Sequence, residues 1–340
     1  MQIKRNISLK PFNSFGLDVQ SHYFTHVSSL NDLTSSLHFA KQKNIPFFIL
    51  GGGSNVLFVK DFPGLIIKIE LKGIEVEREN DHFLWVRAYA GERWPDFVDH
   101  SVDQGWSGIE NLSLIPGTVG AAPIQNIGAY GVEVKETIES VRVLNTDTLE
   151  ISEMNNQDCE FNYRNSAFKN KLKGKYLVLS VLFKFNKQFI PKIQYQPLKN
   201  WFEKQNKEKV GLKEVSEAVK AIRRSKLPDP SVIGNAGSFF KNPTIDQSLA
   251  QRIKDEHPDL PVYKVNDKKV KIPAGWLIEQ CGWKGKRIGD AGVHPHQALV
   301  LVNYGHASGQ DILDLAERIQ QSVKKKFNLM LEPEVNILSV

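Results

Sequence analysis

The sequence predicts an α+β protein, because helical and strand patterns alternate in both halves of its 340 residues. Two other observations agree with this class. Glycine-rich stretches interrupt the pattern where loops would connect strands and helices. The composition, with 41% hydrophobic and 24% charged residues, is typical of a soluble globular protein. A chain of this length can hold two or three domains with sizeable cores.

The N-terminal part carries the patterns of one long helix and several buried strands. Residues 28–44 are expected to be helical, since Leu30, Leu33, Leu37 and Ala40 lie at helical spacing. A second, shorter helix is expected over 95–104, with Pro95 in its first turn. Strands are predicted at 46–50, 65–71, 83–90, 140–145 and 177–185.

The pattern changes near Phe189, where a second α/β region is expected to begin after a highly charged connector at 203–213. Helices are predicted over 213–224 and 247–256, and a strand over 298–304. The first of these helices should stop at Leu227-Pro-Asp-Pro230. Ser308 and Asp311 resemble a capping box that opens a helix reaching about residue 327. Residues 329–338 are strand-like, and we expect them to return to an earlier sheet.

Composition and charge exclude several classes of protein. Residues 1–10 lack the apolar run of a signal peptide, and no apolar stretch approaches the roughly 20 residues that span a bilayer. Two cysteines without metal-ligand spacing favour a reducing cytoplasm. The net charge of +6 is mild, and its lysine clusters mostly lack interleaved aromatic residues, so no nucleic-acid partner is expected. His294-Pro-His296 has no third ligand nearby, and we predict no metal site.

Two glycine-rich stretches predict a site for a large polyanionic ligand. Residues 116–131 are almost without charge or bulk, and 51–55 follow a predicted strand directly. Small residues with accessible backbone N–H groups suit a phosphate. The shorter stretch is neither a dinucleotide fingerprint nor a Walker loop. A dinucleotide such as FAD, with a pyrophosphate and a long flat ring system, would need both stretches. Ordinary irregular loops remain the alternative.

Three polar residues outside these stretches are candidates for chemistry. Arg164 offers a rigid guanidinium fork suited to a carboxylate or a developing enolate, although a surface arginine is the alternative. Ser238 stands between a glycine turn and two phenylalanines, without the elbow of a hydrolase nucleophile. It is either a turn serine or a proton donor to a strongly basic carbanion. Glu334 lies in the last strand-like segment and could point into a cleft.

Together these strings resemble one family, the UDP-N-acetylenolpyruvoylglucosamine reductases. Most of the chain takes part, in order. The strings that carry the resemblance are Asn13-Ser-Phe-Gly16, Leu50-Gly-Gly-Gly-Ser-Asn-Val-Leu57, the stretch 115–131, Cys159-Glu-Phe-Asn-Tyr-Arg-Asn-Ser166, Lys226-Leu-Pro-Asp-Pro230, the stretch 234–243, Ala274-Gly-Trp-Leu-Ile278 and Leu331-Glu-Pro-Glu-Val335.

The resemblance implies a fold and a reaction. The fold would be a p-cresol methylhydroxylase-like FAD-binding region of two α/β subdomains, followed by an α/β substrate-binding domain. The expected boundaries are 1–70 with the C-terminal strand 329–340, then 71–212, then 213–328. NADPH would reduce noncovalent FAD, and UDP-N-acetylglucosamine enolpyruvate would then accept the hydride at C3 to give UDP-N-acetylmuramate. This reaction belongs to peptidoglycan synthesis, and therefore to cell wall biogenesis, cell shape and cell division.

The resemblance also implies roles for individual residues. Ser238 matches the proton donor to C2, and Arg164 and Glu334 match the pair that stabilises the enolate. The family type with a substrate-clamping tyrosine supplies the matches Tyr195, Lys226, Asn242, Tyr263 and Gln297 for substrate binding. The predicted FAD contacts are Gly51, Gly52, Gly53, Ser54, Asn55, Pro116, Gly117, Thr118, Gly120, Gln125, Asn126, Gly128 and Ala129.

Two alternatives stay open at this point. The chain could be another FAD-dependent oxidoreductase on the same scaffold, such as an oxidase. Covalent attachment in that group often uses His or Cys, and neither glycine-rich stretch contains one, so noncovalent FAD is favoured. A non-catalytic basic binding protein would leave the strings around Arg164, Ser238 and Glu334 without a purpose. No spare apolar stripe is evident, and we expect a monomer.

Overall fold

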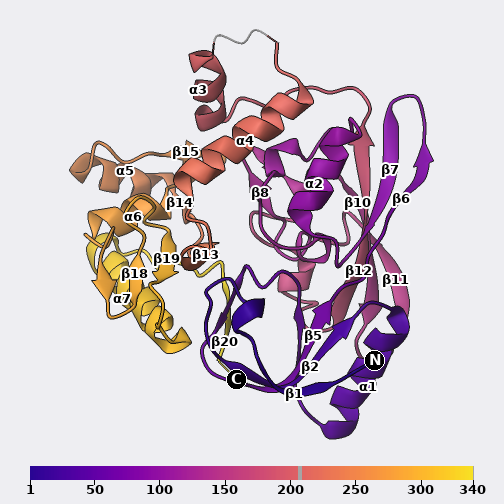
Figure 1. The fold of residues 1–340 in the computed structure, drawn as a ribbon. Coiled ribbons are helices and arrows are strands. Elements are labelled where there is room, and N and C mark those ends of the chain that lie inside the picture. The colour runs from indigo at the N-terminus through magenta and orange to yellow at the C-terminus, as the bar shows by residue number, and fades with distance from the viewer. Residues whose placement is uncertain (206–208, 340) are drawn as a thin grey trace. The chain divides into compact units, whose positions relative to one another are not determined.

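The computed structural model describes residues 1–205 and 209–339 (Figure 1). The chain forms two compact units. The N-terminal unit comprises Met1–Ile7, Ser21–Gly53 and Pro63–Ser225. The C-terminal unit comprises Ser8–Gln20, Ser54–Phe62 and Lys226–Val340. The α+β class is confirmed, because both units combine helices with sheets.

A four-stranded sheet and one helix form the first part of the N-terminal unit. The strand order is β1 (Lys4–Ser8), β2 (Gln20–Val27), β5 (Phe62–Ile69) and β3 (Phe47–Leu50). Strands β3 and β5 are parallel, with Leu50 opposite Lys68. Helix α1 (Leu30–Lys43) begins after Ser29, whose side chain accepts a hydrogen bond from the backbone N–H of Asp32. Its apolar face joins the same core as the inward residues of β5.

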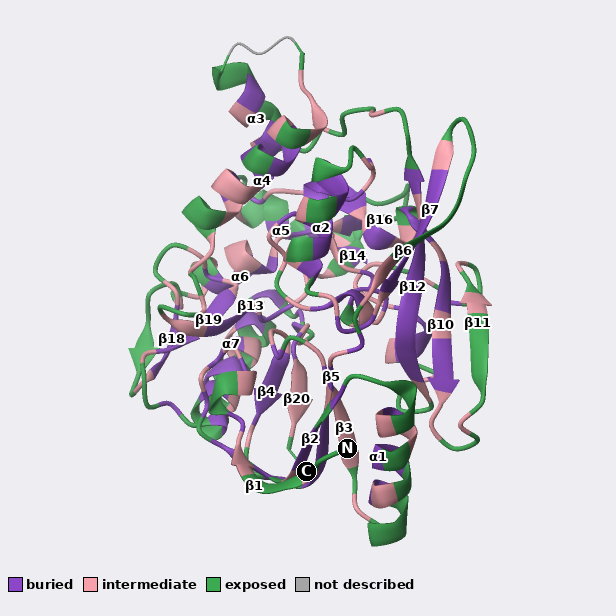
Figure 2. Ribbon diagram, turned by 45° about the vertical axis from the view of Figure 1, so that its right-hand side comes forward, coloured by how far each residue is buried: buried purple, intermediate pink, exposed green. Residues whose placement is uncertain are grey.

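The second part of the N-terminal unit is a five-stranded antiparallel sheet. The order is β11 (Ile151–Asn155), β10 (Ile138–Asn145), β12 (Tyr176–Asn186), β7 (Phe83–Tyr89) and β6 (Ile74–Glu79). Helix α2 (Trp94–Asp103) packs on it, with the Phe97 and Phe183 rings 5.0 Å apart. Figure 2 shows β10 and β12 largely buried and the edge strand β11 exposed.

Smaller elements complete this unit. A hairpin joins β8 (Gly128–Ala129) to β9 (Val132–Glu133). Helices α3 (Gln196–Lys204) and α4 (Leu212–Lys226) share a small apolar core around Leu198, Phe202 and Val219. The predicted connector over 203–213 lies partly outside the described residues. Its residues 203–204 are the last two of α3, and its residues 212–213 are the first two of α4.

The C-terminal unit is built from three sheets, three α-helices and the short 3-10 helix Lys10–Phe12 among its described residues. The sheets are β13 (Gly234–Ser238), β19 (Val300–Asn303), β18 (Ala291–Val293) and β17 (Arg287–Ile288); β14 (Thr244–Asp246), β16 (Lys269–Lys271) and β15 (Tyr263–Lys264); and the pair β20 (Asn336–Leu338) and β4 (Val56–Phe58). The helices are α5 (Gln247–Glu256), α6 (Ala274–Gln280) and α7 (Gly309–Phe327). The capping box of Ser308 and Asp311 is confirmed at the start of α7, which packs beside β18 and β19.

The last segment of the chain forms less regular structure than the sequence suggests. Only Asn336–Leu338 is a strand, and it pairs in parallel with Val56–Phe58. The earlier residues make an isolated bridge, in which Pro333 lies opposite Phe240. The two compact units also differ from the three predicted domains, since residues 8–20 and 54–62 group with the C-terminal half. The boundaries at 70, 212 and 328 stay a prediction. Within the described residues, no helix is both long and apolar enough to cross a bilayer.

The two cysteines should differ sharply in reactivity. Cys159 is fully buried, and its burial, followed by the nearby Asp158, raises the pKa of its thiol to about 12. Since the thiolate is the reactive form, only about 1 in 10⁴ of Cys159 is ionised at pH 8. Cys281 is half-buried. We expect Ellman's reagent to modify one thiol in the native protein and two after unfolding. In a Cys281→Ser variant the native signal should vanish, and rapid native labelling of that variant would contradict the burial.

Candidate functional site

The two glycine-rich stretches meet in the N-terminal unit. Gly51 follows β3 directly, and Gly52 lies against Gly117 so closely that a Cβ at Gly52 would stand 2.8 Å from the Gly117 Cα. A Cβ at Gly51 would stand 2.7 Å from Thr118 Oγ1. Gly117 itself has a φ of +128°, a conformation that favours glycine. The sequence therefore needs glycine here because two backbones approach each other.

The second stretch is fixed to the five-stranded sheet and to α2. The Gly117 carbonyl accepts a hydrogen bond from Trp94 N at 3.0 Å, and Gly120 N donates to the Ala90 carbonyl at 3.0 Å. The first stretch has a different character. Within residues 1–205 and 209–339, the backbone N–H groups of Gly51, Gly52 and Gly53 donate no hydrogen bond. Such clustered backbone donors beside a narrow glycine surface are suited to an anion.

The side chains of Asn126 and Gln125 form hydrogen bonds that hold the second stretch in place. Asn126 is fully buried, and its Nδ2 donates to Glu133 Oε2 and to the Asn162 carbonyl, each at 3.0 Å. Its Oδ1 accepts from Lys135 N at 3.1 Å. Gln125 Oε1 accepts a hydrogen bond from Lys169 Nζ at 3.3 Å. The side chain of Asn126 thus shapes the loop through protein partners.

Arg164 is held against the same stretch. Its guanidinium donates to the Gly128 carbonyl and lies 5.2 Å from the centre of the Tyr163 ring. The neighbouring Ser166 donates to the Ile124 carbonyl at 2.6 Å. Arg164 has a φ of +50°, which a non-glycine residue rarely adopts. The loop around Arg164 is therefore built onto the glycine-rich stretch.

An aromatic and cationic cluster lies near Arg164. The rings of Tyr130 and Tyr195 meet edge to face, with centres 5.7 Å apart. Arg223 on α4 donates its Nε to the Leu114 carbonyl at 3.2 Å, just before the glycine-rich stretch. Burial lowers the pKa of Arg223, the charge of Arg164 lowers it further, and Tyr130 opposes both. Arg223 forms no ion pair in the described part of the chain, so this cluster favours an anionic ligand.

In the C-terminal unit, Ser238 and Glu334 lie on neighbouring backbone segments. Ser238 ends β13 opposite Val300, and the next residue, Phe239, is fully buried. Glu334 N donates to the Phe239 carbonyl at 2.8 Å. Asn55 joins them, since its Nδ2 donates to the Glu334 carbonyl at 3.4 Å. This unit thus brings Glu334 close to Asn55, 279 positions earlier in the sequence, and to the residue that follows Ser238.

Two predicted substrate residues meet at the start of α6. Asn242 Oδ1 accepts a hydrogen bond from Ala274 N at 2.9 Å. A Cβ at Gly275 would lie 3.7 Å from Gln297 Oε1. The other two are exposed in this unit: Lys226 ends α4, and Tyr263 lies on the edge strand β15. His294 and His296 stack edge to face beside Gln297, with ring centres 5.7 Å apart. Burial, together with His296, lowers the pKa of His294.

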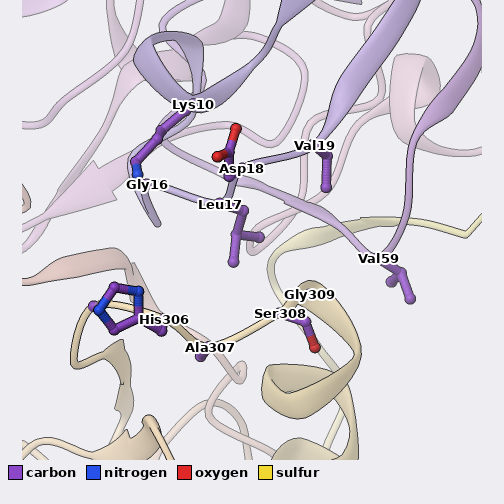
Figure 3. Close-up of a pocket in the computed structure, with 11 residues that line it drawn as sticks. Lys10, Gly16, Leu17, Asp18, Val19, Val59, His306, Ala307, Ser308 and Gly309 are labelled. Carbon is purple, nitrogen blue, oxygen red and sulfur yellow. The ribbon is translucent and has the colours of Figure 1, made fainter.

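A separate pocket of about 260 Å³ in the C-terminal unit contains none of the predicted site residues (Figure 3). Lys10, Asp18 and His306 contribute its charged and titratable side chains. It borders the beginning of α7, where Ser308 N donates to Asp311 Oδ2 and Asp311 N donates to Ser308 Oγ. This pocket therefore contributes nothing to the candidate site.

The comparisons with known proteins agree with this arrangement. A family model described as FAD binding domain matches residues 22–151, and one described as UDP-N-acetylenolpyruvoylglucosamine reductase, C-terminal domain, matches residues 229–338. The UDP-N-acetylenolpyruvoylglucosamine reductase of Flavobacterium johnsoniae is 47% identical over 99% of this chain and 100% of its own. That of Pseudomonas fluorescens is 46% identical over 99% of both chains. The crystal structure of the Thermus caldophilus reductase, 23% identical, shares the fold with a TM-score of 0.69 over 99% of both chains.

The fold and the glycine-lined site thus define an FAD-dependent oxidoreductase. The two joined stretches fit FAD, since a side chain at Gly51 or Gly52 would fill the cradle that they form. The chain belongs to the UDP-N-acetylenolpyruvoylglucosamine reductase family. Sequence reasoning did not single out Lys68, Tyr130 or Arg223, which the structure places beside Gly51, Tyr195 and Arg164. Of these, only Lys68 carries a sequence signal, a charge inside the apolar run 65–69.

Proposed function

We propose that this protein reduces the enolpyruvyl group of UDP-N-acetylglucosamine enolpyruvate to the lactyl ether of UDP-N-acetylmuramate, with NADPH as the hydride donor. One hydride from NADPH and one proton from solvent balance the reaction, and NADP⁺ leaves. The observation that carries the proposal is the hydrogen bond from Glu334 N to the carbonyl of Phe239, the residue after Ser238, in a chain that also holds the glycine cradle. Membership of the family supports the substrate.

FAD would be held by residues of the two glycine-rich stretches, 51–55 and 116–131. The N–H groups of Gly51 to Gly53 face no acceptor within the described residues and are offered to the diphosphate. Pro116, Gly117, Thr118, Gly120, Gly128 and Ala129 supply the opposite wall, with Gln125 and Asn126 shaping it. Ser54 and Asn55 continue the first stretch. When bound, FAD stores the hydride between its delivery by NADPH and its transfer to the substrate.

Three residues are proposed to act on the reacting atoms. Ser238 donates a proton to C2 of the substrate after hydride arrives at C3. The residue ends β13 and is half-buried, so a bound substrate can reach it. Arg164 and Glu334 stabilise the enolate that forms in between. Arg164 is suited to this task because its loop is fixed to Gly128. The second guanidinium, Arg223, adds positive potential for the substrate carboxylate.

The remaining predicted residues are proposed to bind the sugar nucleotide. Asn242 and Gln297 lie together at the start of α6 and would contact one part of it. Tyr195 and Tyr263 are 48% and 59% exposed, so both rings can cover a ligand. Lys226 is exposed and supplies a cation for a phosphate. We further propose a monomer in the cytoplasm with no nucleic-acid partner, since both substrates are small nucleotides.

The direct test is spectroscopic and kinetic. We expect the purified protein to be yellow with bound flavin and to oxidise NADPH only when the enolpyruvyl sugar nucleotide is present. The control replaces that substrate with UDP-N-acetylglucosamine, which lacks the enolpyruvyl group and should support no turnover. The proposal would be contradicted by a protein that neither gains FAD on reconstitution nor oxidises NADPH with the enolpyruvyl substrate.

A further inference from the structure

A single cationic side chain lies directly at the base of the first glycine-rich stretch. Lys68 is on β5, opposite Leu50 in the parallel pair with β3, and Gly51 follows Leu50. Its Nζ donates a hydrogen bond to the Gly51 carbonyl at 2.6 Å. The rest of that strand is apolar, with Leu65, Ile67 and Ile69 in the core of the N-terminal unit. A lysine in such a position is costly unless its charge has a partner.

No carboxylate of the described residues forms an ion pair with that charge on Lys68. Glu70, two residues along the chain, is instead bonded to His26 at 2.9 Å, and Lys72 is paired with Glu92. Burial lowers the pKa of Lys68, and Lys72 lowers it further while Glu70 opposes the change. Burial therefore destabilises this ammonium despite the charge of Glu70, and an anion bound nearby would relieve the cost.

The surrounding backbone identifies the kind of anion. The N–H groups of Gly51, Gly52 and Gly53 have no acceptor within the described chain, while the Gly51 carbonyl is turned to Lys68. The ammonium therefore binds the carbonyl of the first glycine of this turn. On the other side of the turn, Thr118 Oγ1 borders the Cβ position of Gly51. Backbone donors backed by a cation are suited to phosphate oxygens.

We propose that Lys68 is a positioning residue for the FAD diphosphate: it orients the Gly51–Gly53 turn through the Gly51 carbonyl and supplies positive charge behind it. Because Lys68 acts through the turn, its loss should weaken the binding of ligands that carry the diphosphate. It should not weaken the binding of the flavin ring alone. The inference rests on FAD as the cofactor. Should the wild-type protein bind no FAD, the cofactor assignment fails; should it bind FAD while the variants bind it equally well, only this inference fails.

The experiment compares ligands with and without the diphosphate on the full chain after FAD is removed. FAD and riboflavin are titrated against wild type, Lys68→Met and Lys68→Gln by flavin fluorescence. Lys68→Met should weaken FAD binding about 10- to 100-fold while leaving the riboflavin Kd within about threefold, since a charge-assisted contact is lost. Lys68→Gln keeps a donor for the Gly51 carbonyl without the charge, and it should weaken FAD binding by an intermediate factor. If Lys68→Met does not fold, Lys68→Gln serves as the test variant in its place.

Lys72→Met is the matched control. It removes a lysine four residues further along, whose Nζ is paired with Glu92 at 3.3 Å, and it should leave the FAD Kd unchanged. The salt dependence of FAD binding supplies a second readout, which should flatten in Lys68→Gln but not in Lys72→Met. Equal loss of riboflavin and FAD affinity in the Lys68 variants would overturn the proposal. So would a Lys68→Gln protein that binds FAD as tightly as wild type.

Discussion

Replacement of Ser238 by alanine is expected to separate the two halves of the reaction. Reduction of the bound flavin by NADPH should proceed at the wild-type rate, because Ser238 has no task in that half. Reoxidation by the enolpyruvyl sugar nucleotide should slow by about 10²- to 10⁴-fold, the contribution of a positioned proton donor. Anaerobic stopped-flow measurement of the flavin absorbance follows each half separately.

Two further variants sharpen this prediction. Ser238→Cys should retain part of the reoxidation rate, because a thiol can also donate a proton. Ser248→Ala changes an exposed serine of the same unit, on α5, and should alter neither half-reaction. Equal slowing of both half-reactions in Ser238→Ala would show that the serine shapes the site and does not supply the proton.

The second large effect is expected from Gly52→Ala. The new methyl group would stand 2.8 Å from the Gly117 Cα, and a backbone atom cannot rotate out of the way. The two stretches must therefore move apart, and the cradle that they form widens. Forced overpacking of this kind costs about 1–3 kcal/mol. FAD binding should accordingly weaken about 10- to 100-fold, measured as the flavin content of the purified protein and as the Kd after reconstitution.

Gly275→Ala provides the control for Gly52→Ala. A Cβ at Gly275 meets only ordinary contacts, the nearest being Leu299 Cγ at 3.4 Å, and the residue lies in the C-terminal unit. It should bind FAD like wild type. Full flavin occupancy of Gly52→Ala would show that the two stretches separate without cost, and would remove the reason for glycine at this position.

Most elements that bury an apolar face were predictable from the sequence. The periodicity of α1, α5 and α7 gave their positions to within about two residues, since each has an apolar stripe at helical spacing. Strands β6 and β11 were missed because they lie at the edges of the sheet, and most of their residues are exposed and polar. Residues 329–335 were predicted as strand, but only isolated contacts form there.

The candidate site was predictable only in part. The glycine stretches, Arg164, Ser238 and Glu334 stand out because unusual residue types occur in unusual strings. Arg223 and Tyr130 gave no such signal, since an arginine on a helix and a tyrosine in a turn are common. Their significance comes from the Leu114 carbonyl and from the Tyr195 ring, which approach them from distant parts of the chain. The roles of all these residues in binding and catalysis stay predictions.

The sequence by itself determined the class of fold, the family and the residue types that the chemistry needs. Those properties depend on local patterns and on ordered strings, which are present in the chain before it folds. The tertiary structure alone decided that Gly52 lies against Gly117, that Glu334 lies beside Phe239, and that Lys68 bonds the Gly51 carbonyl. Such contacts join residues between 17 and 95 positions apart, so they arise from packing and register that no local pattern encodes.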